Sequence, residues 1–156
     1  MFEDFDAQYM EMALAEARNA ERAGEVPVGA VIVVDGAVIA RGFNQPISTN
    51  DPTAHAEMIA LREAARSAAN YRLSAATMYC TLEPCMMCAG AMIHARLAKL
   101  VFGALDPKAG SAGSIYNVLT DPRLNHRVQT TSGVLLDRCG GILTRFFQEQ
   151  RRLGKK

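Results

Sequence analysis

Aromatic residues are scarce in this chain and tryptophan is absent, so that only 6% of the 156 residues are aromatic. Proteins that hold single-stranded nucleic acid on a broad stacking platform depend on exposed aromatic rings. The composition therefore argues against such a platform. Any recognition of bases must rest on pocket shape and polar contacts.

Long apolar runs are absent as well. No stretch approaches the roughly 18 consecutive apolar residues of a membrane-spanning helix, so no membrane partner is expected. The first residues, Met-Phe-Glu-Asp-Phe-Asp, are acidic, whereas a secretory signal peptide begins with positive charge. We therefore expect no signal peptide here.

Cysteine and histidine are both rare, with four and three residues. The cysteines, at positions 80, 85, 88 and 139, are not spaced as a disulfide framework. Because disulfides persist in oxidising compartments, reduced cysteines predict a cytoplasmic protein. The chain has no second Cys-x-x-Cys pair and no His-x-x-x-His pair. It thus lacks the four closely spaced ligands of a closed structural zinc site.

Length and charge set the next limits. A chain of 156 residues, 49% of them hydrophobic, suffices for one full core, and we expect residues 1–156 to form a single domain. The net charge of +1 hides an asymmetry, since residues 1–95 carry a net charge of −6 and residues 96–156 one of +7. Two interpretations stay open: uneven solvated charge, or a polyanion-binding surface built from the C-terminal half.

Hydrophobic periodicity and breaker residues predict alternating helices and strands. Helices are expected over 6–23, 53–69, 85–95 and 136–153, and strands over 28–34, 37–44, 77–81, 100–104 and 129–135. This order is typical of an α/β protein with one sheet and helices on both of its faces. The sheet should be antiparallel at the first hairpin and parallel through the crossovers.

Local signals place the ends of several elements. Asp6 is the expected N-cap of the first helix and Gly24 its stop. Asp35-Gly36, between two β-type runs, predicts a hairpin with a type I′ turn. Thr53 or Asp51 is expected to cap the second helix.

Two C-terminal segments bear on function. Residues 105–127 read as a long loop with one helical turn near 115–119, and a loop of this length in a small domain is usually functional. The closing helix ends in a basic cluster of Arg145, Arg151, Arg152, Lys155 and Lys156. Both segments belong to the positively charged half of the chain.

The stretch 83–88, Glu-Pro-Cys-Met-Met-Cys, organises the chemistry. If Pro84 opens a helix, Cys85 and Cys88 lie on one face of its first turn, where the helix dipole favours thiolates. Two such thiolates bind one soft or borderline cation, most commonly zinc. His55, thirty residues upstream of Cys85, supplies a third ligand and is followed by Glu57. Three protein ligands leave a fourth position for water, which is typical of catalytic zinc.

His-x-Glu followed by Pro-Cys-x-x-Cys is the known signature of zinc-dependent nucleobase deaminases. Zinc with two thiolates and a neutral His carries no net charge, so a water on it can lose a proton near neutral pH. Glu57 is expected to take that proton, pass it to the ring nitrogen as hydroxide attacks the amino-bearing carbon, and help protonate the departing ammonia. Helix capping does not explain Glu57, because a capping box from Thr53 needs its acid at position 56.

His55 and Glu57 are two residues apart, so they can face one point only at the first turn of a helix. We therefore expect the helix N-termini at His55 and Cys85 to point into one pocket. Backbone amides near Ala56 or Cys85 are candidates to support the developing charge.

Each candidate also has a plainer interpretation. A lone histidine at a helix start is usually structural, and a lone Cys-x-x-Cys pair has other uses. Cys80 and Cys139 are expected to be core residues. The order of His55, Glu57, Pro84 and the two cysteines makes chance a poor explanation for the whole set.

Four further stretches resemble a known family. They are 51–57 (Asp-Pro-Thr-Ala-His-Ala-Glu), 89–94 (Ala-Gly-Ala-Met-Ile-His), 102–110 (Phe-Gly-Ala-Leu-Asp-Pro-Lys-Ala-Gly) and 125–128 (Asn-His-Arg-Val). With the metal motif they make the chain similar to the bacterial tRNA-specific adenosine deaminases, members of the cytidine-deaminase-like superfamily that convert the wobble adenosine of a tRNA anticodon to inosine. The similarity extends from Glu25 to the Phe146-Phe147 helix, nearly the whole chain.

The resemblance implies a three-layer α/β/α sandwich with a five-stranded mixed sheet, and a homodimer. It implies that His55, Cys85 and Cys88 bind one Zn²⁺ per subunit and that Glu57 is the catalytic proton shuttle. The partner is the anticodon arm of a tRNA. The family positions that contact the target nucleoside or line the anticodon-loop groove match Asn44, Asp106, Lys108, Asn125, His126 and Arg127.

Three other functions are open at this point. A deaminase of free guanine, cytosine or a nucleotide has the same metal motif, although a small substrate needs no long basic loop and tail. An RNA-binding module with structural zinc is disfavoured by Glu57 and by the missing fourth ligand. A redox Cys-x-x-Cys protein is disfavoured because metal would hold both thiols.

Overall fold

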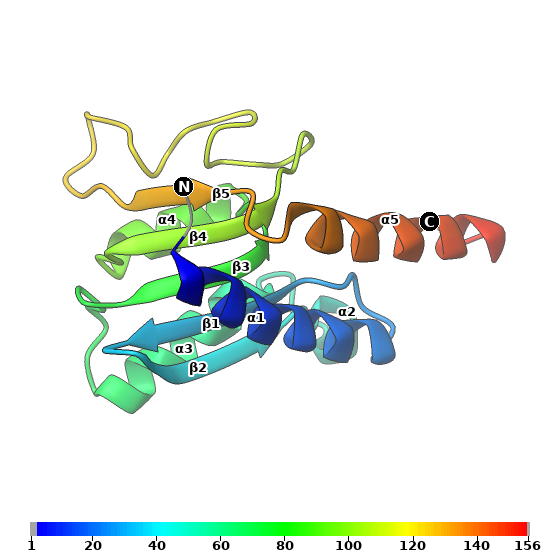
Figure 1. Ribbon diagram of the computed structural model, residues 1–156, viewed down its shortest axis with the longest axis horizontal. Coiled ribbons are helices and arrows are strands. Elements are labelled where there is room, and N and C mark those ends of the chain that lie inside the picture. Colours follow the sequence, from blue (N-terminus) through cyan, green and yellow to red (C-terminus); the bar gives the residue numbers. More distant parts are fainter. Residues whose placement is uncertain (1–2, 156) are drawn as a thin grey trace.

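The computed structural model describes residues 3–155, which form one five-stranded sheet with helices on both faces (Figure 1). The helices are α1 (Asp4–Arg22), α2 (Pro46–Thr49), α3 (Ala56–Ala68), α4 (Met86–His94) and α5 (Leu136–Arg152). The strands are β1 (Gly29–Val34), β2 (Ala37–Phe43), β3 (Thr77–Leu82), β4 (Lys99–Ala104) and β5 (Gln129–Ser132). Met1 and Phe2 of the acidic start, and Lys156 of the basic cluster, lie outside the described residues.

The strands lie in the order β2-β1-β3-β4-β5. β1 pairs antiparallel with both β2 and β3, whereas β3, β4 and β5 are mutually parallel. The expected mixed sheet, antiparallel at the first hairpin and parallel through the crossovers, is confirmed. The crossover through α3 passes over β1, so β3 joins the sheet beside β1 rather than beside β2.

Two apolar clusters lie on the two faces of the sheet and make the three layers. α3 and α4 pack on one face, against β1 residues such as Ala30 and Ile32, while α1 and α5 pack on the other, against Val31 and Val33. Successive side chains of a strand point to opposite faces, and in β1 both faces are buried, which is why its sequence is a continuous apolar run. The expected three-layer α/β/α sandwich is confirmed.

The first hairpin and the end of α1 follow their local signals, and the start of α1 does not. Asp35 and Gly36 have φ values of 49° and 76°, as a type I′ turn requires. Gly24, with φ 77°, follows Ala23, the C-cap of α1. Asp6 is not the N-cap. Glu3 caps α1, and Asp6, one turn in, accepts hydrogen bonds from the Glu3 backbone N–H and the Tyr79 hydroxyl.

The second long helix begins later than its capping signals indicate. His55, not Thr53 or Asp51, is the N-cap of α3, while Asp51 accepts hydrogen bonds within its own turn. The side-chain oxygen of Asn44, from the end of β2, accepts the Ala56 N–H at 2.9 Å. A distant residue thus performs the capping, which a local sequence pattern does not reveal.

A short helix, α2, lies between β2 and α3. Two smaller expectations are corrected. No helical turn forms near 115–119, where Asn117 instead makes an isolated β-bridge with Ala112. β5 ends at Ser132 rather than at 135.

Among residues 3–155, no helix is both long and apolar enough to cross a membrane.

Glycine in β2 allows α3 to approach the sheet closely. A Cβ atom on Gly42 would lie 2.4 Å from the Ala56 carbonyl oxygen and 2.9 Å from the Ala60 nitrogen. Backbone atoms cannot yield as a flexible side chain does, so a larger residue must push the start of α3 away from the sheet.

Gly42→Ala is therefore expected to lower the free energy of unfolding by about 1–3 kcal/mol, measured by urea denaturation. Gly90→Ala in α4 is the matched control, because no atom lies within 4 Å of the added Cβ and alanine is the better helix former by about 0.5–1 kcal/mol. Equal stability of Gly42→Ala and the unmodified chain would contradict the close α3–β2 contact.

Candidate active site

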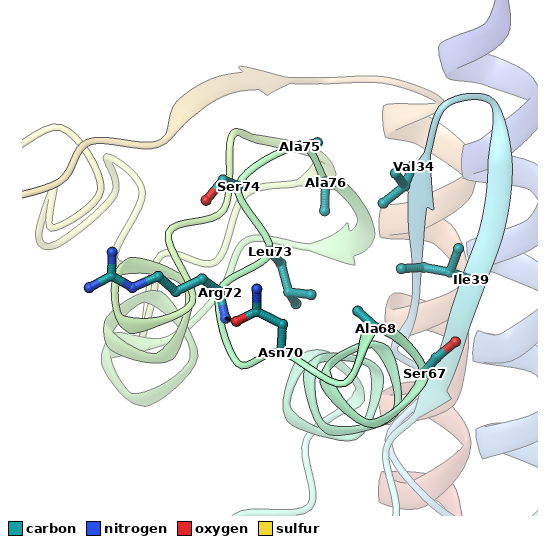
Figure 2. A pocket seen from close by; sticks show the side chains of 10 residues that line it. All are labelled: Val34, Ile39, Ser67, Ala68, Asn70, Arg72, Leu73, Ser74, Ala75 and Ala76. Atoms are coloured by element: carbon teal, nitrogen blue, oxygen red, sulfur yellow. Dashed lines mark hydrogen bonds between the residues drawn. The ribbon is translucent and has the colours of Figure 1, made fainter.

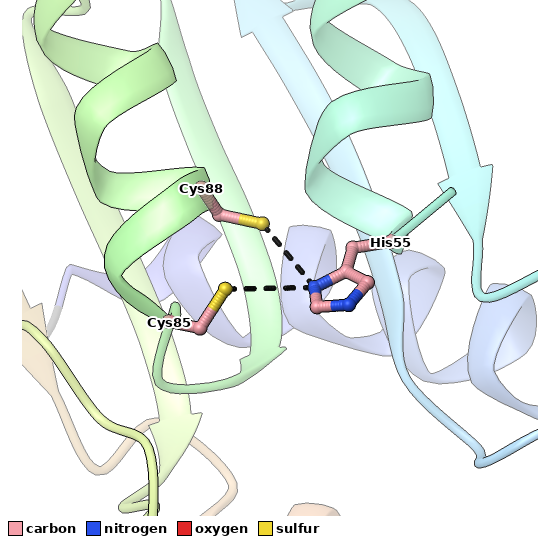
Figure 3. Close-up of side chains that lie close together, drawn as sticks. All are labelled: His55, Cys85 and Cys88. Atoms are coloured by element: carbon pink, nitrogen blue, oxygen red, sulfur yellow. Dashed lines mark hydrogen bonds between the residues drawn. The ribbon is translucent and has the colours of Figure 1, made fainter. Parts of the chain in front are cut away.

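Two helix N-termini meet at the end of the sheet where β3 finishes. His55 is the N-cap of α3, Cys85 is the N-cap of α4, and Cys88 lies in the first turn of α4. Figure 3 shows the His55 ring turned toward both sulfurs, with Nδ1 at 3.6 Å from Cys85 Sγ and 3.5 Å from Cys88 Sγ. All three ligand atoms lie within 4.8 Å of one another. The three predicted ligands thus form a candidate metal site.

The electrostatics of the cluster favour charge on one sulfur. Hydrogen bonding from Cys88, and then from His55, lowers the pKa of the Cys85 thiol to about 4. The hydrogen bond to Cys85 raises the pKa of Cys88, and burial adds to this effect. The hydrogen bond between His55 and Cys85 raises the pKa of His55. Cys85, at the positive end of the α4 dipole, is thus the more acidic of the two thiols.

Glu57 lies beside the cluster in the first turn of α3 and is only 4% exposed. Burial raises the pKa of its carboxyl above the usual value. It lines one pocket together with His55 and Cys85, so the expected convergence of both helix N-termini is confirmed. A buried carboxyl with a raised pKa next to a metal site suits a group that takes up and releases protons.

The pocket has a volume of about 240 Å³. Its other lining residues come from the segment before β1, the segment after β2, the end of β3 and the loop after β4, and include Val28, Asn44, Pro46, Leu82, Glu83, Asp106 and Ala109. Asn44 offers its side-chain oxygen to the Ala56 N–H, and its NH₂ group therefore remains available as a donor. The Ala56 amide is committed to this bond, so support of developing charge by the other amides near Ala56 or Cys85 stays a prediction.

The other expected substrate residues divide into two groups. Asp106 lines the pocket, and Lys108 lines an adjoining hollow of about 480 Å³ that shares Val26, Leu82 and Asp106 with it. The adjoining hollow also contains Phe147 and Arg151 of α5. Basic side chains of the C-terminal half therefore do lie next to the pocket.

Asn125, His126 and Arg127 lie elsewhere. They precede β5, whose first residue pairs with Lys99 at the start of β4, whereas the pocket lies beyond the end of β4. The His126 Nε2 atom hydrogen bonds to the Leu97 carbonyl oxygen at 2.8 Å, and Arg127 donates to the Pro122 carbonyl. Within one chain these three residues hold their own loop and are not brought into the pocket.

Two buried carboxylates near the pocket escaped the sequence interpretation. Glu83 accepts hydrogen bonds from the loop after β4, and Glu25 accepts the backbone N–H groups of Ile47 and Ser48 in α2. Burial acts to raise the pKa of Glu83, but hydrogen bonds from Ser114 and from three backbone N–H groups outweigh it and lower the pKa. For Glu83, the sequence signal that could have revealed a buried carboxylate is a single acidic residue between an apolar strand and Pro84.

A third hollow, of about 450 Å³, lies at the opposite end of the sheet (Figure 2). It is formed by the tip of the β1–β2 hairpin, the end of α3 and the segment before β3, with Val34, Ile39 and Leu73 among its apolar residues. Arg72 is the charged side chain in its lining. It has no group suited to acid–base or metal chemistry, so the chemistry belongs to the His55–Cys85 end.

Comparisons with known proteins agree with this geometry. Residues 5–151 match the family described as MafB19-like deaminase. The chain is 48% identical over 150 residues to the tRNA-specific adenosine deaminase of Bacillus subtilis, covering 96% of this chain and 93% of the relative. It is 50% identical over 149 residues to that of Haemophilus influenzae, covering 95% and 86%.

A solved structure from a study of A-to-I editing by tRNA:A34 deaminases at the wobble position of transfer RNA superposes with a TM-score of 0.84. It is 44% identical, and the alignment covers 87% of this chain and 99% of that one. Sequence, fold and metal site thus lead to the same assignment. The chain belongs to the MafB19-like deaminase family, and within it to the tRNA-specific adenosine deaminases.

Proposed function

We propose that this protein is a zinc-dependent hydrolase that converts the wobble adenosine of a tRNA anticodon to inosine and releases ammonia. The observation that carries the proposal is the convergence of His55, Cys85 and Cys88 beside the buried Glu57 in one pocket. The identity of 48–50% to tRNA-specific adenosine deaminases over nearly the whole chain supports the choice of substrate.

The donor set fits zinc. A tetrahedral zinc ion, about 2.3 Å from sulfur and about 2.0–2.1 Å from imidazole nitrogen, holds those two atoms about 3.5 Å apart. The separations between His55 Nδ1 and the two sulfurs are 3.6 and 3.5 Å. His55, Cys85 and Cys88 would hold one zinc ion per subunit and leave a fourth position open to the pocket.

The proposed chemistry divides between metal and protein. Zinc held by His55, Cys85 and Cys88 would supply a Lewis acid that lowers the pKa of a water molecule to near neutrality. Glu57 would take one proton from the attacking water and deliver it to the ring nitrogen next to the carbon under attack. It would then carry the proton of the newly attached hydroxyl to the departing amine, which leaves as ammonia. Water supplies the oxygen of the product and ammonia leaves, so the reaction needs no oxidant or reductant. Burial raises the pKa of Glu57, which makes its carboxylate a stronger base toward the attacking water.

Substrate binding is proposed to rest on polar contacts from both sides of the pocket. The Asn44 NH₂ group can donate to the target nucleoside, because its oxygen is committed to Ala56. Asp106 lines the other side, and Lys108 and Arg151 lie where a flanking phosphate would pass. A single-stranded loop suits such a pocket, since its bases can be turned outward at low cost.

The enzyme is also proposed to be a single-domain, cytoplasmic homodimer. Asn125, His126 and Arg127 can contact substrate only if the RNA extends past the pocket or if a second subunit presents them to it.

The deciding measurement is inosine formation on an anticodon stem-loop with adenosine at the wobble position. Glu57→Gln should retain one zinc per chain and lose about 10²–10⁴-fold in turnover, because the proton shuttle is removed. Near-full activity of Glu57→Gln would show that another group moves the proton.

Free adenosine, cytidine and guanine are the parallel substrates in that assay. Ammonia released from one of them, with none from the RNA, would keep the zinc chemistry and overturn the tRNA assignment. Zinc-loaded protein that acts on none of these substrates would favour an RNA-binding module with structural zinc.

Thiol reactivity tests the metal site without any turnover. After zinc removal, iodoacetamide at pH 6 should label Cys85 first, because a pKa of about 4 leaves its thiolate fully formed at that pH. Cys139, whose pKa burial raises to about 12, and the buried Cys80 are internal controls that should stay unlabelled. Stoichiometric zinc should protect Cys85, as followed by peptide mass spectrometry. Equal labelling with and without zinc would contradict the proposed ligand set.

Asn44 can be tested by separating its two hydrogen-bonding roles. Asn44→Asp keeps an oxygen for the Ala56 N–H and removes the NH₂ donor, so it should raise KM for the stem-loop about tenfold with little change in thermal stability. Asn44→Ala also loses the cap and should cost about 1 kcal/mol of stability. An unchanged KM for Asn44→Asp would exclude the donor role.

A further inference from the structure

Glu83 joins the metal site to a substrate-facing loop. It lies between β3 and α4, two residues before Cys85, and is 2% exposed. Its carboxylate accepts the backbone N–H groups of Asp106, Ala112 and Ser114, each at 3.0 Å, and the Ser114 hydroxyl. One buried side chain therefore binds both ends of the segment 106–114.

This segment has few other ties to the body of the protein. The Asp106 carboxylate accepts the N–H groups of Lys108 and Ala109, which closes a local turn, and Ser111 N–H donates to the Pro84 carbonyl. The fit around Glu83 is tight: a Cβ atom on Gly110 would lie 2.3 Å from the Glu83 carboxyl carbon. The path of the loop is therefore set largely by the Glu83 carboxylate.

The part of the loop so fixed forms a wall between two cavities. We call residues 105–109 the ridge. Asp106 and Ala109 line the pocket beside Glu57, while Leu105, Pro107 and Lys108 line the adjoining hollow. A shift of the ridge would therefore alter both cavities. The Glu83 hydrogen bonds go to the loop and not to His55 or Cys88.

We propose that Glu83 is a positioning residue that fixes the ridge relative to Cys85, so that it governs the affinity for the RNA substrate and not the chemical step. This inference rests on the proposed function for its substrate. Glu83 lines the pocket, but all four hydrogen bonds of its carboxylate go to Asp106, Ala112 and Ser114, so it acts through the backbone of this loop.

Glu83→Gln is a selective probe of this role. Two backbone N–H donors, from Ala112 and Ser114, face Oε2, so that position must remain an oxygen. The glutamine NH₂ group must then replace Oε1, where it opposes the Asp106 N–H, while the Ser114 hydroxyl can rotate to accept from it. The substitution thus releases the ridge end of the loop and keeps the other end.

The kinetic test compares Glu83→Gln with Asp6→Asn. Asp6 is an equally buried carboxylate that accepts the Tyr79 hydroxyl at 2.8 Å on the α1 side of the sheet. Glu83→Gln should retain full zinc content, raise KM for the stem-loop about tenfold or more, and keep kcat within about threefold. Asp6→Asn should leave both constants unchanged. Loss of zinc, a fall in kcat alone, or the same KM rise in Asp6→Asn would overturn the proposal.

Hydrogen–deuterium exchange tests the positioning without any substrate. In the unmodified protein the Asp106, Ala112 and Ser114 amides should be the most protected of the loop, and in Glu83→Gln the Asp106 amide should exchange about tenfold faster or more. Rapid exchange of all three in the unmodified protein overturns the role even if Glu83→Gln fails to fold. Absence of inosine formation by the unmodified protein would instead overturn the proposed function, while the exchange data still decide the role of Glu83.

Discussion

The convergence of two helix N-termini at one end of the sheet is the constraint on which the rest of the structure depends. α3 contributes His55 and Glu57, and α4 contributes Cys85 and Cys88. Each helix leaves free N–H groups and positive potential at its start, which favours thiolate at Cys85. Small residues allow this convergence, since Gly42 lets α3 approach β2 to backbone contact.

Around this centre, two buried carboxylates and one half-buried amide hold backbone in place. Glu25 satisfies N–H groups of α2, Glu83 satisfies those of the loop after β4, and Asn44 satisfies the first N–H of α3. Buried polar groups are costly unless hydrogen bonded, and these three meet that requirement by fixing irregular segments. The walls of the pocket therefore owe their shape to polar contacts, while the layers behind it owe theirs to apolar packing.

The sequence predicted what periodic patterns and motifs encode. The strands, the long helices, the type I′ turn and the candidate metal site were recoverable because each depends on nearby residues or on a distinctive spacing. The cap of α3 by Asn44 and the role of Glu83 were not, because each joins residues far apart in the chain. Pairing of β5 with the start of β4 places residues 125–127, within one chain, at the other end of the sheet from the pocket, so their expected role at the groove stays a prediction.

The segment 120–125 is closed by hydrogen bonds at its base, whereas the ridge is held by Glu83 through the Asp106 N–H. The bond from Val128 N–H to the Leu119 carbonyl, at 2.8 Å, closes the base of this excursion, and His126 fastens it to Leu97. Five of its six residues are exposed. Compact loops whose ends meet in this way accept changes in length without moving the body that carries them. Within one chain, a change in the length of residues 120–124 is thus expected to leave the pocket at the other end of the sheet in place.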